Sequence, residues 1–219
     1  MNKKPKYWSK ALKVLSRKDI VIKKLILKYQ DKTLSTRKDL FYSLCKSIVG
    51  QQISVAAANS VFKKFLKICK GKINPCNVVI LSTYQLKKCG LSRQKVKGIK
   101  ELAKKFKNKS FDPKKITKMG DEEAIIYLSN LRQIGRWSAE MILIFNLNRS
   151  NIWPIQDIGL LRAISKNYKT KYHPPKTFVK KLSKKFAPYC TVATWYLWRS
   201  IDDEPCLLYT SPSPRDATL

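Results

Sequence analysis

The sequence predicts an all-α fold, and three observations support this prediction. Apolar residues recur at helical spacing along nearly the whole sequence, which lacks the alternating runs typical of strands. Local signals also mark the ends of the helical segments: Ser92 is a candidate N-cap, and Gly71, Gly90 and Pro188 lie between segments. No internal repeat is visible, which favours a compact multi-helix protein over a helical solenoid.

The pattern predicts helices over residues 9–29, 37–49, 54–69, 84–89, 93–106, 121–131, 136–147, 158–167, 176–186 and 189–200. The segment 93–106 illustrates the reasoning, because its apolar residues share one helical face and lysines occupy the other. These apolar residues are Val96, Ile99, Leu102, Ala103 and Phe106. A stripe of this kind belongs to a core and not to a cofactor site.

The sequence also predicts two lobes and a foreign tail. The connection 148–154 is the most exposed in character, so we expect a middle lobe over 36–148 and a second lobe from 1–35 plus 149–205. From Cys206 onward the composition changes, because residues 206–219 contain no lysine. This segment resembles translated read-through of a sequencing adapter, and we expect it to lie outside the fold. The alternative is a genuine disordered tail rich in Ser and Pro.

The net charge indicates a polyanionic partner. The chain has 46 Lys and Arg against 14 Asp and Glu, a formal charge of +32. Lysines that neutralise phosphates release counterions, which drives binding to nucleic acid without reading sequence. The alternative is that an AT-rich genome enriches lysine on a solvated surface. A nucleic-acid-binding motif is therefore needed in addition to the charge to support this function.

Several other classes of protein are disfavoured by the composition. The six cysteines form no C-x-x-C pair, and the only histidine, His173, precedes two prolines as a loop residue would. We therefore expect no metal site and no Ser-His or Cys-His nucleophile. No apolar run is long enough to span a membrane, and the N-terminus lacks the features of a signal peptide. We expect a cytoplasmic, nucleoid-associated protein with no membrane partner.

Residues 128–147 read as two helices joined by a tight turn that contains Gly135. Such a hairpin presents successive backbone N–H groups at a helix N-terminus, where they can bind phosphate without contacting bases. An ordinary αα-hairpin with no binding role is an equally good interpretation on geometry alone.

Resemblance to a known family distinguishes between these interpretations. The hairpin resembles the L-P-G-[IV]-G-R-x-[ST]-A pattern of the helix-hairpin-helix DNA glycosylase superfamily at Leu131, Ile134, Gly135, Arg136, Ser138 and Ala139. Arg132 replaces the usual proline and Gln133 the first glycine. Gln133 must therefore adopt the backbone conformation that this glycine normally takes, at some cost in strain.

Three further segments resemble the 3-methyladenine DNA glycosylase branch: IVGQQISVAAA from Ile48, CGLSRQK from Cys89, and IWPIQDIGLLR from Ile152. The resemblance covers most of the chain and implies a two-lobed helix-hairpin-helix DNA glycosylase fold. It also implies a DNA-3-methyladenine glycosylase II-like enzyme of base excision repair that hydrolyses the N-glycosidic bond of alkylated purines. The implied partner is double-stranded DNA containing alkylated bases, bound by a monomer.

The resemblance assigns roles to individual residues. Asp157 is implied as the catalytic carboxylate, and Trp137, Met141 and Trp198 as walls of the base pocket, with Asp157 and Trp198 across a cleft from Met141. The implied DNA-binding residues are Gln51, Gln52, Ile134, Gly135, Arg136 and Ser138. Gln52 lies at the intercalating position, beside Gln51.

Two further implications concern the chemistry. Trp137 stands where the strand-cleaving branches carry a Schiff-base lysine, so no lyase activity is expected. No cofactor is expected, although the hairpin of this family often holds a monovalent cation through backbone carbonyls, here those of Ser129, Leu131 and Ile134.

Three alternatives stay open at the level of sequence. Asp157 precedes the predicted helix 158–167 and could be an ordinary N-cap, although one residue can serve both roles. The chain could be a non-catalytic helix-hairpin-helix DNA-binding protein, which the Asp157 motif argues against. It could also be a glycosylase for another lesion, such as uracil or a mismatched base.

Overall fold

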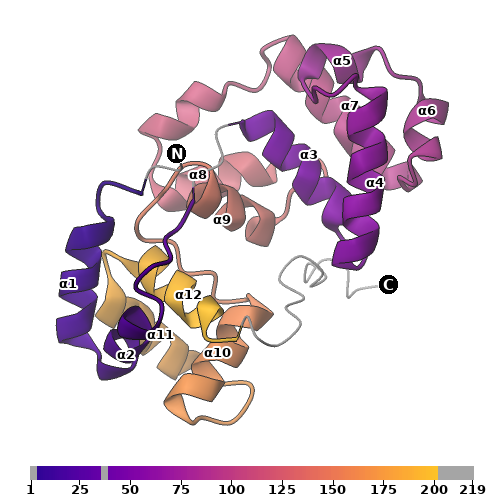
Figure 1. The fold of residues 1–219 in the computed structure, drawn as a ribbon. Helices are drawn as coiled ribbons and strands as arrows, with labels where there is room; N and C mark the ends of the chain where they lie inside the picture. The colour runs from indigo at the N-terminus through magenta and orange to yellow at the C-terminus, as the bar shows by residue number, and fades with distance from the viewer. Residues whose placement is uncertain (1–3, 36–38, 202–219) are drawn as a thin grey trace. The chain divides into compact units, whose positions relative to one another are not determined.

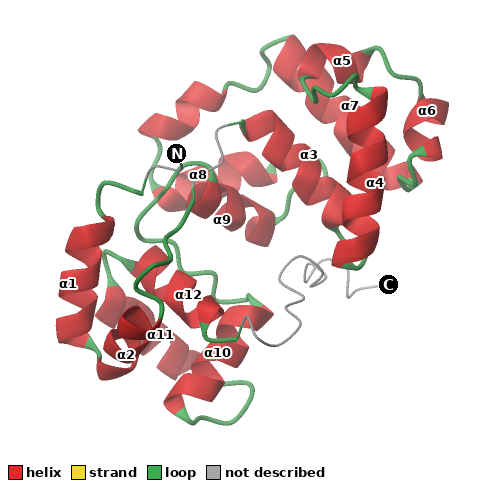
Figure 2. Ribbon diagram, viewed as in Figure 1, coloured by secondary structure: helices red, strands yellow, loops and turns green. Residues whose placement is uncertain are grey.

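The computed structural model describes residues 4–35 and 39–201, which form helices joined by loops (Figures 1 and 2). These residues contain no strand, so the predicted all-α fold is confirmed. None of their helices is long and apolar enough to cross a membrane. The predicted foreign tail, 206–219, lies outside the described residues.

The chain divides into two compact units. The described residues of the first, which we call the terminal unit, are 4–35 and 143–201, and those of the second, the central unit, are 39–142. The expected boundary was at 148, whereas the division falls between residues 142 and 143, inside α9 (Arg136–Phe145).

The terminal unit contains α1 (Trp8–Lys18), α2 (Ile20–Lys28), α10 (Ile158–Tyr168), α11 (Lys176–Phe186) and α12 (Cys190–Arg199). The central unit contains α3 (Leu40–Gly50), α4 (Val55–Ile68), α5 (Pro75–Val79), α6 (Thr83–Lys88), α7 (Arg93–Lys107), the 3₁₀ helix η1 (Pro113–Lys118) and α8 (Asp121–Ser129). The sequence analysis missed α5 and η1, which have 5 and 6 residues, although it predicted the equally short α6. Helices of this length give only a weak periodic signal.

In the terminal unit, helices from both ends of the sequence pack together. Every residue of α12 from Cys190 to Trp198 is buried, and α1 and α2 contact α12 (Figure 1). The Trp8 ring of α1 meets the edge of Trp195 of α12 at 5.3 Å between ring centroids. Helix α12 is therefore the core of this unit, and it is covered by segments far away in the sequence.

The single helix predicted over 9–29 is wrong, because Asp19 separates α1 from α2. Its backbone is extended, with φ −150° and ψ 122°, and its side chain accepts a hydrogen bond from the Ile22 N–H as the N-cap of α2. The carboxylate also accepts hydrogen bonds from the Tyr168 hydroxyl at 3.0 Å and the Lys185 ammonium at 2.6 Å. Asp19 thus ties the α1–α2 corner to α10 and α11.

Asp19 should stabilise the terminal unit through its charge. Burial by itself raises the pKa of this carboxyl, but the hydrogen bonds from Lys185, the Ile22 N–H and Tyr168 outweigh burial and hold the pKa below its usual value. We expect Asp19→Ala to lower the free energy of unfolding by about 2 to 3 kcal/mol, because it removes both an N-cap and a buried carboxylate that is paired with the partly exposed Lys185. Urea denaturation at pH 7 measures this loss.

Asp39→Ala is the matched control, since Asp39 is an exposed N-cap of α3 and capping alone is worth about 1 kcal/mol. The Asp19 contribution should be complete above the unfolded-state pKa of about 3.9 and disappear as the pH falls through the lower folded-state pKa. Equal losses for the two variants, at all pH values, would contradict the role given to the buried Asp19 carboxylate and its partners.

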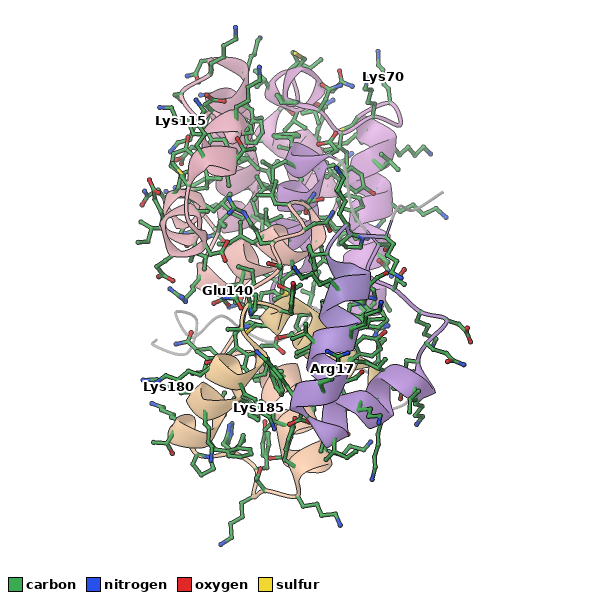
Figure 3. All side chains as sticks on the ribbon, turned by 90° about the vertical axis from the view of Figure 1, so that its left-hand side faces the viewer. Arg17, Lys70, Lys115, Glu140, Lys180 and Lys185 are labelled. Atoms are coloured by element: carbon green, nitrogen blue, oxygen red, sulfur yellow. The ribbon has the colours of Figure 1, made fainter. Side chains whose placement is uncertain are left out.

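The central unit is organised around α7, which contacts α3, α5 and α6. The apolar stripe predicted on α7 is buried at Val96, Ile99, Leu102 and Ala103. Lysines such as Lys70 and Lys115 project outward from this unit, whereas Glu140 lies among the helices (Figure 3). Lys95 is a buried exception to this distribution of charge.

Candidate active site and DNA-binding segments

Asp157 is buried at the start of α10, with 2% of its surface exposed. Its Oδ1 atom accepts a hydrogen bond from the Leu160 N–H at 2.6 Å, which makes Asp157 the N-cap of α10 as the sequence suggested. The same oxygen accepts a second hydrogen bond from Nε1 of Trp198 at 2.8 Å. Both donors are neutral, so they orient the carboxylate without neutralising its charge.

Trp198 comes from α12 and is itself buried, with 2% of its surface exposed. Its ring stacks on Phe145, with centroids 6.0 Å apart and an angle of 12° between the ring planes. The indole is thus held on its face by Phe145 and at its nitrogen by Asp157. Sequence reasoning assigned Trp198 to the base pocket and missed its bond to the carboxylate, because that contact joins residues 41 positions apart.

Trp137 and Met141 lie one helical turn apart on α9, and both are half-buried. Residues four apart lie on the same face of a helix, as the sequence analysis expected. Both residues belong to the central unit, whereas Asp157 and Trp198 belong to the terminal unit. The cleft that would join these four residues stays a prediction.

The predicted intercalating residue, Gln52, lies in the turn 51–54 between α3 and α4. It is exposed and has a φ of 56°, in the left-handed region that non-glycine residues rarely adopt. Its neighbour Gln51 is half-buried, and its Nε2 donates a hydrogen bond to the Gln133 carbonyl at 2.7 Å. The two glutamines therefore differ, since Gln52 is presented to solvent and Gln51 attaches the turn to the hairpin.

The hairpin turn between α8 and α9 has the strained residue that the sequence predicted. Gln133 has a φ of 67°, so the expected glycine-like backbone is confirmed. The turn is closed by a hydrogen bond from the Ile134 N–H to the Leu131 carbonyl at 3.0 Å, and the Ile134 side chain is buried. A Cβ atom added to Gly98 of α7 would come within 2.8 Å of the Gln133 Cγ. Gly98 therefore provides the space that the Gln133 side chain occupies.

Two predicted DNA-binding side chains have partners inside the protein. The Arg136 guanidinium binds both carboxylate oxygens of Glu122, at 2.5 and 2.7 Å, and its Nε lies 3.2 Å from the buried Glu140. The hydrogen bonds from Arg136 lower the pKa of Glu122. A phosphate contact by this side chain would compete with Glu122, so the backbone of Arg136, at the start of α9, is the better candidate.

Ser138 is also buried, with 4% of its surface exposed, and its hydroxyl lies 3.2 Å from that of Ser47 in α3. The Ser138 side chain therefore connects α9 to α3 inside the central unit. Gly135 is half-buried, and its carbonyl accepts the Ala139 N–H in the first turn of α9.

Lys95, the last residue of the CGLSRQK segment, and Gly98 lie near these segments, and the sequence analysis gave neither of them a role. The Lys95 Nζ donates hydrogen bonds to the carbonyls of Val49, at 3.0 Å, and Gln51, at 2.6 Å. A signal was available, because Lys95 falls on the same helical stripe as Ile99 and Leu102. A lysine at an apolar position of this kind indicates a specific buried partner.

Of the described cysteines, Cys45, Cys69, Cys89 and Cys190 are buried and Cys76 is exposed. Burial raises the pKa of Cys69 to about 11 and that of Cys190 to about 12, so both are protonated thiols at neutral pH. Within residues 4–35 and 39–201, no group of three His, Cys, Asp or Glu side chains is arranged to hold a metal ion.

Comparison with known proteins identifies the family. The profile of the "HhH-GPD superfamily base excision DNA repair protein" matches residues 45–188, which include both the hairpin and Asp157. The chain belongs to this superfamily. The resemblance seen in the sequence motifs is therefore confirmed, and the protein is a base excision DNA repair protein.

Relatives of the chain are similar over most of their length. The chain is 29% identical over 180 residues to DNA-3-methyladenine glycosylase 1 of Schizosaccharomyces pombe. The alignment covers 81% of this chain and 79% of that protein. The chain is 32% identical over 163 residues to the alkylbase DNA glycosidase-like protein mag2 of the same yeast, covering 73% and 76%. The superfamily member is thus similar to proteins of the 3-methyladenine branch.

Solved structures of this branch have the same fold. The structure is similar to that of the DNA-3-methyladenine glycosidase from Bacillus halodurans, with a TM-score of 0.78, 26% identity, and coverage of 89% of this chain and 91% of that one. It is also similar to the 3-methyladenine DNA glycosylase Mag1 of S. pombe in complex with abasic DNA, with a TM-score of 0.74 and 27% identity. That alignment covers 92% of this chain and all of the other, 100%.

Proposed function

We propose that this superfamily member is a monofunctional DNA glycosylase that releases alkylated purines from duplex DNA, with Asp157 as its catalytic carboxylate. The buried Asp157 carboxylate, oriented by the Leu160 N–H and the Trp198 indole, is the observation that carries the proposal. The names of its relatives as 3-methyladenine glycosylases support the substrate class.

The carboxylate fits the charge that develops when a base departs. As the C1′–N bond breaks, its electron pair leaves with the base and positive charge builds on the sugar. Asp157 would stabilise this oxocarbenium-like state and orient a water molecule toward C1′. The water oxygen then bonds to C1′ and gives up a proton to solvent, which leaves an abasic sugar and a free base. A purine alkylated at a ring nitrogen such as N3 or N7 is cationic and departs as a neutral base, so one carboxylate suffices.

Base recognition would use stacking more than hydrogen bonds. A cationic purine is attracted to an aromatic face by about 0.5 to 2 kcal/mol, and Trp137, with Met141 one turn away, supplies a soft surface of this kind. Gln52, exposed in its turn, would fill the space left by the extruded nucleotide. The backbone N–H groups at the start of α9 would bind phosphate.

A monovalent cation at the hairpin is a further part of the proposal. The Ser129 hydroxyl at the end of α8 is buried with no hydrogen-bond partner. We propose that a cation bound to carbonyls such as that of Leu131 would supply positive charge near a DNA phosphate.

The proposal predicts an intact abasic product. Duplex oligonucleotides containing hypoxanthine or an alkylated purine should release free base, and the strand should break only after alkali. Borohydride should trap no covalent complex, because Trp137 offers no amine for a Schiff base. Gel analysis of the strands and chromatography of the released base measure the two outcomes.

A panel of lesions separates this proposal from its alternatives. Uracil and 8-oxoguanine duplexes serve as controls and should release little base. Release of uracil alone would replace the proposed substrate class, whereas tight DNA binding with no release from any lesion would identify a non-catalytic DNA-binding protein. Efficient borohydride trapping would overturn the monofunctional assignment.

A further inference from the structure

Lys95 is unusual for a lysine in this protein. It is the only lysine within residues 4–35 and 39–201 that is buried, with 9% of its surface exposed. Its Nζ donates to the carbonyls of Val49 and Gln51, at 3.0 and 2.6 Å. These carbonyls belong to the last turn of α3 and to its C-cap, where backbone carbonyls lack helical partners and the helix dipole is negative.

Stability alone does not explain a lysine at this position. Burying an ammonium group is unfavourable, and well-packed apolar side chains often replace buried charges without loss of stability. Burial also lowers the pKa of Lys95, because it disfavours the charged ammonium form. Two charge-assisted hydrogen bonds compensate for this cost, and both hold the backbone that leads into the turn 51–54.

The held turn is in direct contact with the hairpin. Gln51, whose carbonyl is fixed by Lys95, donates through its own side chain to the Gln133 carbonyl at 2.7 Å. Gly98, three residues after Lys95 on α7, makes room for the Gln133 side chain. Helix α7 therefore supports the turn at Lys95 and the hairpin at Gly98, and Gln51 joins the two supported segments.

We propose that Lys95 is a positioning residue for base extrusion, which fixes the turn carrying Gln52 relative to the DNA-binding hairpin. The proposal rests on the proposed function, in which the hairpin holds the DNA backbone while Gln52 enters the duplex. An inserted side chain must resist the restacking of the duplex, so the turn that carries it needs a rigid support. Gln52 is in a left-handed conformation, and a turn strained in this way persists only where its surroundings hold it.

Lys95→Met tests the proposal, because methionine fills similar space without donating a hydrogen bond. The same lesion is placed in a fully paired duplex and in a small bubble, where the flanking bases are already unpaired and extrusion is easier. We expect kcat/KM of Lys95→Met to fall about tenfold on the paired duplex and by less than about threefold on the bubble. A tenfold loss is the size expected when charge-assisted hydrogen bonds are removed.

Lys100→Met is the matched control. Lys100 also lies on α7, and its Nζ also donates to a backbone carbonyl, that of Leu81 at 2.7 Å, far from the turn in the sequence. This variant should keep wild-type activity on both substrates. Equal losses of Lys95→Met on the paired and bubble substrates would overturn the positioning role, since a general structural defect affects both alike.

A second pair of variants keeps the proposal testable if Lys95→Met fails to fold. Gly98→Ala places a methyl group against Gln133 and should displace the hairpin from α7, with a similar loss confined to the paired duplex. Gln133→Gly removes the side chain that the methyl group meets but keeps the carbonyl that Gln51 binds. The double variant should recover most of the activity, and failure to recover would contradict the proposed support by α7.

The proposed function and this inference can fail separately. Base release by the wild-type protein tests the function. The role of Lys95 is also tested without excision, by 2-aminopurine fluorescence opposite a stable abasic analogue in a bound duplex. Wild type and Lys100→Met should unstack the fluorophore equally, and Lys95→Met should do so less. Identical fluorescence for all three proteins would overturn the inference.

Discussion

Asp157→Asn is expected to reduce single-turnover base excision by about a hundredfold or more, while the melting temperature and the affinity for lesion DNA stay nearly unchanged. Asparagine keeps an Oδ1 atom that can accept hydrogen bonds from both the Leu160 N–H and the Trp198 indole. Asparagine also caps helices about as well as aspartate. The substitution therefore removes the negative charge and leaves the surrounding geometry in place.

Single-turnover kinetics on a hypoxanthine or alkylated-purine duplex measure this effect, with calorimetry as the control for folding. Asp157→Ala provides the comparison, because it removes the cap and leaves the buried Trp198 N–H without its acceptor. It should be equally inactive but less stable by about 2 to 3 kcal/mol. A folded Asn variant that excises at close to the wild-type rate would reduce Asp157 to a helix cap.

Local sequence signals were sufficient for most of the fold. The stripe on α7 and the N-caps at Ser92 and Asp157 depend on neighbours within one or two turns, and these features are present as predicted. Asp19 shows where local reasoning failed. The apolar period continues through position 19, but the helix ends there, because Asp19 has an extended backbone and caps α2. Its carboxylate is also bound by Tyr168 and Lys185, far away in the sequence.

In the candidate site too, the sequence predicted features that depend on local motifs and missed contacts between distant residues. Motif resemblance selected Asp157, Gln52 and the hairpin, because family patterns record which residue types occupy those positions. It gave no information about what each side chain contacts. Arg136 was expected at DNA and is bound by Glu122 and Glu140, which come from within the central unit.

Gln133 is the most instructive departure from the family pattern. Sequence alone predicted a strained backbone at this position, and the φ of 67° agrees. Sequence alone did not reveal where the Gln133 side chain finds space, since Gly98 lies 35 positions earlier and has no pattern linking it to the hairpin. A substitution in one segment that is accommodated by a small residue in another becomes visible only when the two are placed in space.

Trp198→Phe is expected to lower the excision rate by about ten- to thirtyfold, because a hydrogen bond to a charged group is worth about 1.5 to 2 kcal/mol. Phenylalanine keeps an aromatic ring against Phe145 but cannot donate to Asp157. Of the two donors, only the Leu160 N–H then remains. The carboxylate is therefore less well oriented toward the sugar.

Trp195→Phe is the matched control for the loss of volume. Trp195 lies on the same helix, is buried with 5% of its surface exposed, and packs against Trp8 in the core of the terminal unit. Both variants should lose stability through the cavity they create, and Trp198→Phe should lose more because it also removes the hydrogen bond to Asp157. Only Trp198→Phe should lose excision rate, measured under single-turnover conditions at saturating enzyme.

A double-mutant cycle identifies the route through which Trp198 acts. If Trp198 serves to orient the Asp157 charge, adding Trp198→Phe to Asp157→Asn should lower the residual rate by less than about threefold, since the charge it orients is already gone. If the two losses instead multiply, Trp198 contributes independently of Asp157, as a wall of the base pocket would. In that case its ring contacts the lesion, and the loss of excision rate should vary with the size and charge of the excised base. A loss of rate that acts through Asp157 should instead be similar for every lesion that leaves by the same transition state.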